Sequence, residues 1–275
     1  MAVAMGEVLT GALGELRVHP VDKWVRAYAG ERVVASSARP RLVWEPRRIV
    51  PSYALPRDDI DAELVPDAGP PAAERPVRLR SGGPPLLDPS TPFAAHSCPG
   101  DRLTVRADGV ELTGAAFAPN DDALADYVVL DWSAFSQWRE EDEVVMGHPR
   151  DPFHRIDCLR SSRHVVISSG TQVLADTRRA TILLESMLPP RYYVPREDVR
   201  MNALEPSRRR SICAYKGEAS YWSSTGDHAV PDVAWSYEAP LQDAVPVHDL
   251  VSFFTERLDV VVDGVDVPRP VTPWS

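Results

Sequence analysis

One stretch of the sequence, residues 211–224, gathers side chains that could do chemistry. It contains Cys213 and Lys216, and Gly217 follows the lysine directly. Among the 30 basic residues, only Lys23 and Lys216 are lysines. A lysine ammonium is a compact charge whose pKa responds strongly to burial, whereas an arginine guanidinium is planar and stays charged. Lys216 therefore suggests a tuned site, although a coding bias towards arginine explains the scarcity of lysine equally well.

The thiol of Cys213 lies three residues before this ammonium. A neighbouring positive charge lowers the pKa of a thiol and favours the nucleophilic thiolate. A free cysteine is, however, more often a small buried apolar residue. Cys213 and Lys216 are therefore candidate catalytic residues, and both interpretations of the cysteine stay open.

Aromatic residues accompany this stretch in the second half of the chain. On strands they usually pack in a core, but a cleft lined by tyrosine and tryptophan beside Lys216 would suit a planar or anionic ligand. Two carboxylates, Glu185 and Asp198, recur in the first half as Glu45 and Asp59, so a structural role for them is at least as well supported as catalysis. The expected ligand-binding residues are Glu185, Tyr193, Asp198, Cys213, Lys216, Tyr221, Trp235 and Tyr237.

An internal repeat predicts the elements that position these residues. Residues 51–60 align with residues 190–199 at an offset of 139, with five identities in ten positions. A duplication of this kind decides the architecture of the whole chain. We therefore expect two domains, a first copy over residues 1–147 and a second copy over residues 148–275.

Both copies have the pattern of antiparallel β structure. Short β-branched runs such as residues 164–168 and 181–185, separated by turn residues, predict strands and hairpins. Apolar residues at helical spacing predict a closing helix over residues 247–258 and another over residues 131–138. The predicted fold is mainly β, with two tandem compact antiparallel β domains, each closed by a C-terminal helix.

The first copy carries an insertion. Landmarks in residues 131–139 recur in residues 249–257 at an offset of only 118, which leaves 21 extra residues in the first copy. We place them in residues 65–100, where nine prolines disfavour both strand and helix. This predicts a long proline-rich surface insertion, with Gly82-Gly83 as a turn, that offers a contact surface to a protein partner.

Composition excludes several classes of protein. The net charge of -10, without a long basic run, argues against binding of nucleic acid. No window approaches the roughly 18 apolar residues of a membrane span and the start has no basic leader, so we expect no membrane association and a cytoplasmic location. The absence of phosphate-binding and dinucleotide-binding motifs from the sequence predicts no cofactor.

Three histidines and a cysteine near the middle of the chain are candidate metal ligands. They are His148, His154, Cys158 and His164. Their spacings, with five, three and five intervening residues, match no standard zinc pattern. We therefore expect no bound metal.

Three blocks of the second copy resemble a known family. They are Tyr192-Tyr-Val-Pro-Arg-Glu-Asp-Val199, Cys213-Ala-Tyr-Lys-Gly-Glu-Ala-Ser-Tyr221 and Ala234-Trp-Ser-Tyr-Glu-Ala-Pro240. Their order and spacing resemble the family catalogued as domain of unknown function 427 (DUF427), and residues 269–275 resemble its actinobacterial tandem members. The resemblance covers residues 153–275 well. Where the family has C-P-x-K-G, the first copy reads Cys98-Pro-Gly-Asp without the lysine, so we expect that copy to be degenerate.

The resemblance implies compact, tent- or barrel-like β domains, and the family label suggests a nucleotidyltransferase type. Nucleotidyl transfer uses paired carboxylates that hold Mg²⁺ beside a glycine-rich turn. The one D-x-D motif, Asp59-Ile-Asp61, lies in the copy that lacks the lysine. The residues themselves therefore do not favour transferase activity.

Three functions follow from these features. The first is a protein that binds a small polar or planar ligand in the second copy. The second is an enzyme that uses Lys216 or Cys213 for covalent chemistry, or Lys216 to clamp a phosphate. The third is an interaction module that contacts a protein partner through residues 65–100.

Overall fold

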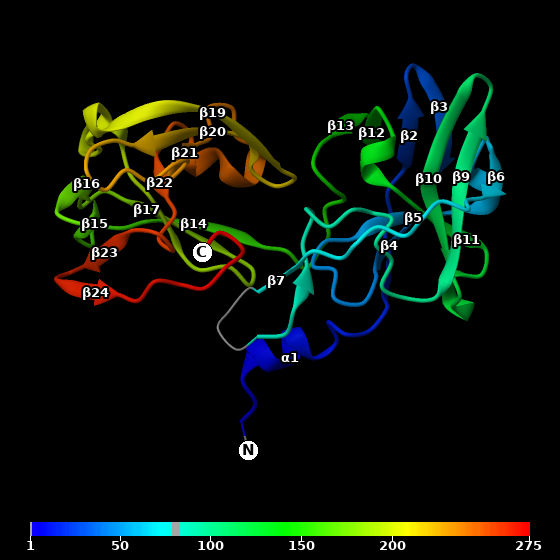
Figure 1. Cartoon of the computed structure of the whole chain (residues 1–275), viewed down its shortest axis with the longest axis horizontal. Coiled ribbons are helices and arrows are strands. Elements are labelled where there is room, and N and C mark those ends of the chain that lie inside the picture. Colours follow the sequence, from blue (N-terminus) through cyan, green and yellow to red (C-terminus); the bar gives the residue numbers. More distant parts are fainter. Residues whose placement is uncertain (1, 79–82) are drawn as a thin grey trace. The chain divides into compact units, whose positions relative to one another are not determined.

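The structure is a computed structural model that describes residues 2–78 and 83–275. It is mainly β with antiparallel sheets, as predicted, and α1 (Met5–Gly11) is the one α-helix in the described residues (Figure 1). No helix among these residues has the length and apolar character needed to cross a membrane. The chain divides into two compact units: unit 1, up to Val77 and over Pro85–Asp151, and unit 2, chiefly Pro152–Ser275.

Unit 1 contains two main sheets. The larger has the order β1 (Arg17–Pro20), β4 (Arg41–Trp44), β5 (Ser52–Pro56), β11 (Tyr127–Leu130), β10 (Val110–Pro119), β9 (Gly100–Ala107) and β6 (Glu63–Pro66). The smaller has the order β13 (Glu143–Val145), β12 (Gln137–Glu140), β2 (Val25–Ala29) and β3 (Arg32–Ser37). Strands β9 and β10 form a long hairpin in the larger sheet (Figure 1).

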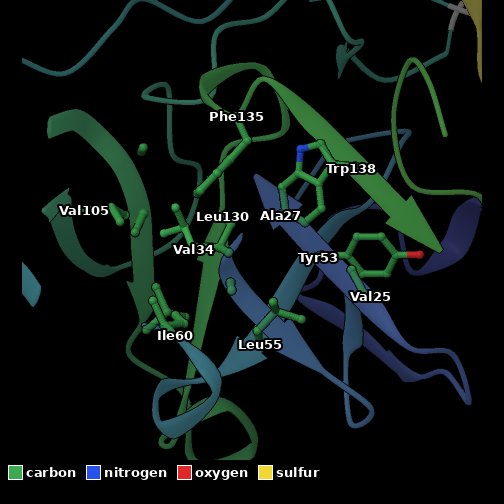
Figure 2. Packing of buried hydrophobic residues seen from close by; sticks show 14 of the residues in the cluster. Val25, Ala27, Val34, Tyr53, Leu55, Ile60, Val105, Leu130, Phe135 and Trp138 are labelled. Carbon is green, nitrogen blue, oxygen red and sulfur yellow. The ribbon is translucent and has the colours of Figure 1, made fainter. Parts of the chain in front are cut away.

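Residues from both sheets share one hydrophobic core in unit 1. Trp138 on β12 and Val25 on β2 are almost fully buried, and the Trp138 ring lies 5.9 Å from the ring of Tyr53 on β5 (Figure 2). Burial of each large apolar side chain contributes about 1.5–3 kcal/mol. The Tyr53 hydroxyl donates to Glu140, which also accepts the Lys23 ammonium at 2.5 Å. The first lysine of the chain is therefore used in an ion pair.

Unit 2 contains three sheets of three or four strands. Their strands are β14 (Ile156–Arg160), β17 (Thr181–Glu185) and β18 (Arg191–Tyr193); β19 (Leu204–Cys213), β20 (Gly217–Ser224), β21 (Ala234–Ser236) and β22 (Ser252–Phe253); and β16 (Gln172–Thr177), β15 (Val165–Ser169), β23 (Asp259–Val262) and β24 (Val265–Val267). Val194, directly after β18, bridges Val251, directly before β22. This bridge links the first two sheets.

The strands of the two units follow a common order. In unit 1 the order runs β1-β4-β5-β11-β10-β9-β6, and in unit 2 β14-β17-β18 continues through the Val194–Val251 bridge into β22-β21-β20-β19. The second sheets correspond in the same way, with β2, β3, β12 and β13 matching β15, β16, β23 and β24. Residues of the two units can be compared by strand register, while the tandem duplication itself stays a prediction.

The predicted closing helices are wrong. Residues 247–258 contain the end of a 3-10 turn (Gln242–Val247) and β22, and residues 131–138 contain a 3-10 turn (Trp132–Ala134) and the start of β12. Asp249 has a φ of 58°, in the left-handed region, which interrupts any right-handed helix there. The apolar spacing imitated a helix because residues 251–256 are all buried, so apolar residues in this segment need not alternate with polar ones as on a half-exposed strand.

The proline-rich segment is also less irregular and less exposed than predicted. β7 (Pro76–Val77) pairs with β8 (Leu86–Leu87), and both leucines are buried. Proline is tolerated in such short two-stranded pairs because its missing N–H can face away from the partner strand. Residues 70–76 are mostly exposed, and Gly82 of the predicted turn lies outside the described residues. A partner surface in residues 65–100 therefore excludes the buried leucines.

Candidate functional site

Glu185, the last residue of β17, is the centre of a buried polar cluster in unit 2. Its Oε2 accepts a hydrogen bond from the Lys216 ammonium, and its Oε1 lies 3.0 Å from Nε2 of His154. The side chains of Glu185 and Lys216 are 8% and 10% exposed. Cys213 lies close enough to Lys216 to help raise the pKa of the ammonium. We call these four residues, His154, Glu185, Cys213 and Lys216, the Glu185 cluster.

Strand pairing and one glycine bring the cluster together. Ile156 on β14 pairs with Glu185, and His154, two residues earlier, reaches the same carboxylate. Lys216 ends the turn between β19 and β20. Gly217 follows at a φ of 96°, a left-handed conformation that glycine adopts without steric cost. The glycine after the lysine is therefore part of what aims the ammonium at the carboxylate.

Glu185 and Lys216 stabilise each other's charge, so both groups stay ionised although they are buried in unit 2. Burial alone would raise the pKa of Glu185, but the charge of Lys216 and the hydrogen bonds from His154 and Lys216 lower it to about 2. Burial would likewise lower the pKa of Lys216, but the negative charge of Glu185 outweighs it and the pKa is raised. The carboxylate is therefore ionised and the ammonium protonated at neutral pH.

An aromatic wall stands beside the cluster. Tyr193, Tyr221, Trp235 and Tyr237 are buried in one hydrophobic cluster. The indole N–H of Trp235 donates to the Tyr193 hydroxyl at 3.1 Å. Burial raises the pKa of Tyr193 and of Tyr237, so both phenols stay protonated. Within residues 2–78 and 83–275 the Tyr237 hydroxyl makes no hydrogen bond, so it has a donor to offer.

The aromatic wall is held by a second buried ion pair. Arg191 on β18 donates to both oxygens of Glu256, at 2.8 and 2.6 Å, and its guanidinium lies 5.6 Å from the ring centroid of Trp235. Thr272 donates to Glu256 at 2.5 Å, and the ring of Trp274 also lies 5.6 Å from the guanidinium. Residues close to Ser275 thus help to fix the wall.

Asp198 is not brought into the Glu185 cluster. It accepts a hydrogen bond from the Thr177 hydroxyl at 2.6 Å and pairs with Arg179, whose hydrogen bond lowers the pKa of Asp198. In unit 1, Asp59 accepts a bond of the same length from Ser37. Asp198 therefore ties a 3-10 turn to the end of β16, and the structure gives it this local bonding role.

Unit 1 contains a corresponding carboxylate that is covered by its own chain. Glu45 directly follows β4, as Glu185 ends β17; its Oε1 lies 3.0 Å from Nδ1 of His96, and its Oε2 accepts the backbone N–H of Ser97 at 2.7 Å. The lysine is absent, as the sequence showed, but Arg48 lies 3.6 Å from the carboxylate and replaces the charge. The guanidinium of Arg48 also donates to backbone carbonyls between Thr91 and Ala95.

His154 is the cluster member that the predicted site lacked. The sequence offers His154 only as a candidate metal ligand, and in the described residues no group of three or more metal-ligating side chains occurs. His164, from the same set, instead pairs with Asp176 at 2.7 Å. No sequence signal links His154 to Glu185, because the contact depends on the β14–β17 register.

The site belongs to an antiparallel β domain with a buried carboxylate, ammonium and imidazole. Residues 157–264, within unit 2, match the model of the NTP_transf_9 family, described as a domain of unknown function (DUF427). The match includes Glu185, Cys213 and Lys216, whereas His154 lies three residues before it. No curated protein matches the chain.

Proposed function

We propose that unit 2 binds a small polar ligand at the Glu185 cluster. The observation that carries this proposal is that the chain buries the Glu45 site of unit 1 more completely than the similar Glu185 site of unit 2. His96 and Glu45 in unit 1 are 7% and 3% exposed, beneath the chain around Thr91–Ser97. His154 in unit 2 is 22% exposed, and in the described part of the chain the hydrogen bonds to the Glu185 carboxylate come from His154 and Lys216.

The energetics of the cluster support a binding role. Removing two charges from water costs several kcal/mol per ion, and a buried ion pair often contributes less to stability than apolar side chains of similar volume. A pair retained under this cost, beside a thiol and the Tyr237 phenol, which makes no hydrogen bond among the described residues, is well suited to recognise polar groups. Since Lys216 and Glu185 neutralise each other, a neutral or zwitterionic ligand suits the site better than a strongly anionic one.

The raised pKa of Lys216 favours binding over covalent chemistry by this residue. An amine nucleophile needs a free lone pair, which requires a lowered pKa. Burial beside Glu185 has the opposite outcome and keeps Lys216 protonated. We therefore assign Lys216 the role of a fixed hydrogen-bond donor.

A thermal-shift screen of small polar compounds tests the proposal. We expect some compounds to raise the unfolding temperature of the wild-type protein and of Lys23→Met, in which the lysine paired with Glu140 is changed. The same compounds should not stabilise Lys216→Met. Lys216→Arg, which keeps the charge but alters its shape, serves if the methionine variant is unfolded. Equal stabilisation of the Lys216 variants, or none of the wild type, rejects the proposal.

A further inference from the structure

Each unit holds an imidazole against its buried carboxylate in a similar way. The ring nitrogens of His96 and His154 both lie 3.0 Å from Oε1 of Glu45 and Glu185, respectively. Both rings also rest on an aromatic side chain. His96 stacks on Phe117 with centroids 3.7 Å apart and planes at 7°, and the centroid of His154 lies 4.2 Å from that of Tyr215 with planes at 29°.

The two histidines occupy different positions in their units. His154 lies two residues before Ile156, the strand partner of Glu185. In unit 1, Arg17 pairs with Trp44, so by the same register the residue that matches His154 is Gly14, which has no side chain. His96 comes instead from the segment between β8 and β9. The imidazole that contacts the carboxylate therefore comes from a different part of the fold in each unit.

The corresponding carboxylates of the two units each bind an imidazole, and each imidazole comes from a different part of the fold. This indicates that the position favours a ring of this kind. An ionised carboxylate accepts a charge-assisted hydrogen bond from a ring N–H, and a flat ring gains further from stacking on an aromatic side chain. The ammonium of Lys216 occupies the other oxygen of Glu185 and leaves Oε1 as the acceptor for the ring.

We propose that Glu185 is a receptor for a planar nitrogen heterocycle that carries a ring N–H, bound in the place where the His154 ring lies. This inference rests on the proposed function and names the ligand class of the same site. The ligand ring stacks on Tyr215 and donates its N–H to Oε1 of Glu185. His154 fills the place when no ligand is present.

Only in unit 2 do we expect a ligand ring to replace the histidine ring. His154 lies in the segment between Asp151 and β14, which has no regular strand pairing, and its side chain is partly exposed. His96 is enclosed by Phe93 and Phe117 and by the chain that bonds Arg48. The expected stoichiometry is therefore one heterocycle per chain.

Imidazole, added to a full-length His154→Gly variant, is the probe. The variant removes the ring and introduces a glycine, the residue found at the matching position of unit 1. Measurements at about pH 9 keep imidazole neutral, since its pKa is roughly 6.5 in a histidine side chain. We expect a saturable rise in unfolding temperature with imidazole. 1-Methylimidazole, which has no N–H when neutral, should bind at least about tenfold more weakly because it leaves the acceptor unpaired.

His164→Gly is the matched control. It removes an imidazole that also pairs with a carboxylate, at 2.7 Å from Asp176, but whose side chain is 33% exposed. This variant should show no saturable response to imidazole. If glycine at residue 154 prevents folding, His154→Ala serves, because it also removes the ring.

Equal binding of imidazole and 1-methylimidazole, or an equal response of the two glycine variants, overturns the ligand class. Failure of this inference can be told from failure of the proposed function. If other polar compounds still bind in a Lys216-dependent manner, the ligand class alone is wrong. If no compound binds, both proposals fail.

Discussion

Arg48 and Lys216 neutralise corresponding buried carboxylates from different distances along the chain. Arg48 follows Glu45 by three residues, whereas Lys216 follows Glu185 by 31 residues. Each unit therefore has a cation at its carboxylate, supplied by a different element. The charge balance around the carboxylate is the common feature, and the identity of the cation is not.

Replacement of Lys216 by methionine should destabilise unit 2 strongly. The change leaves Glu185 ionised or forces it to bind a proton inside the protein, and breaking a buried pair in this way costs about 3–5 kcal/mol. Urea denaturation measures the loss. Lys23→Met should cost about 1 kcal/mol or less, because Lys23 is 30% exposed. A Lys216→Met loss no larger than that of Lys23→Met would contradict the pair's burial.

The depressed pKa of Glu185 predicts a dependence of stability on pH. Its value of about 2 in the folded protein lies below the ordinary value of 4.5, so the unfolded chain binds the proton more tightly. The contribution of Glu185 is complete above about pH 4.5 and disappears as the pH falls towards 2. Urea unfolding over this range should show a smaller acid loss in Glu185→Gln. Identical slopes in both proteins would exclude the shift.

Gly217→Ala tests the turn that positions Lys216. A side chain at a φ of 96° is strained, and its Cβ would also lie 3.2 Å from the carbonyl oxygen of Ala239. Gly264→Ala is the matched control, because Gly264 has a φ of 81° and open space around the new Cβ. Both variants should lose about 1–2 kcal/mol of unfolding free energy because alanine is strained in the left-handed conformation. We expect Gly217→Ala to lose about 1 kcal/mol more than the control because of the contact with the carbonyl. Equal losses by thermal unfolding would show that the carbonyl is no obstacle.

Cys98 should react slowly with thiol reagents. Burial and then the charge of Glu45 raise the pKa of its thiol to about 12. With the other two cysteines changed to serine, labelling at neutral pH should be at least about tenfold slower than that of a free thiol. Glu45→Gln, which removes a negative charge that raises the pKa of the thiol, should make the labelling of Cys98 faster.

The variant that retains only Cys213 examines the enzyme alternative by the same assay. Labelling of Cys213 faster than a free thiol would favour a thiolate nucleophile. A rate at or below the free-thiol value would favour the binding role, in which Cys213 is a polar neighbour of Lys216.

The sequence was sufficient for the fold class and for most members of the cluster. β-Branched runs predicted strands such as β15 and β17, and the scarcity of lysine pointed to Lys216, which the structure places on Glu185. These signals are local in sequence or in composition. The recurrence of Asp198 as Asp59 indicated a structural role, and both carboxylates accept a bond from a hydroxyl at a strand end, from Thr177 and from Ser37 respectively.

The features that were missed depend on tertiary structure. Continuous burial of residues 251–256 allowed a helical spacing of apolar residues without a helix. His154 reaches Glu185 through a strand register that no local pattern encodes. The leucines of β8 are buried and Leu87 bridges Arg48 of unit 1, although proline surrounds them in the sequence.

The bonds from Thr272 and the contact of Trp274 with Arg191 bear on how the second unit can be produced as a fragment. A polypeptide trimmed to residues 157–264 would lack both, and it would also lack His154. Glu256 would then keep Arg191 but lose a hydroxyl donor, and the guanidinium would lose one of its three aromatic neighbours. A fragment intended for crystallisation or ligand screening should therefore begin at Pro152 and extend to Ser275.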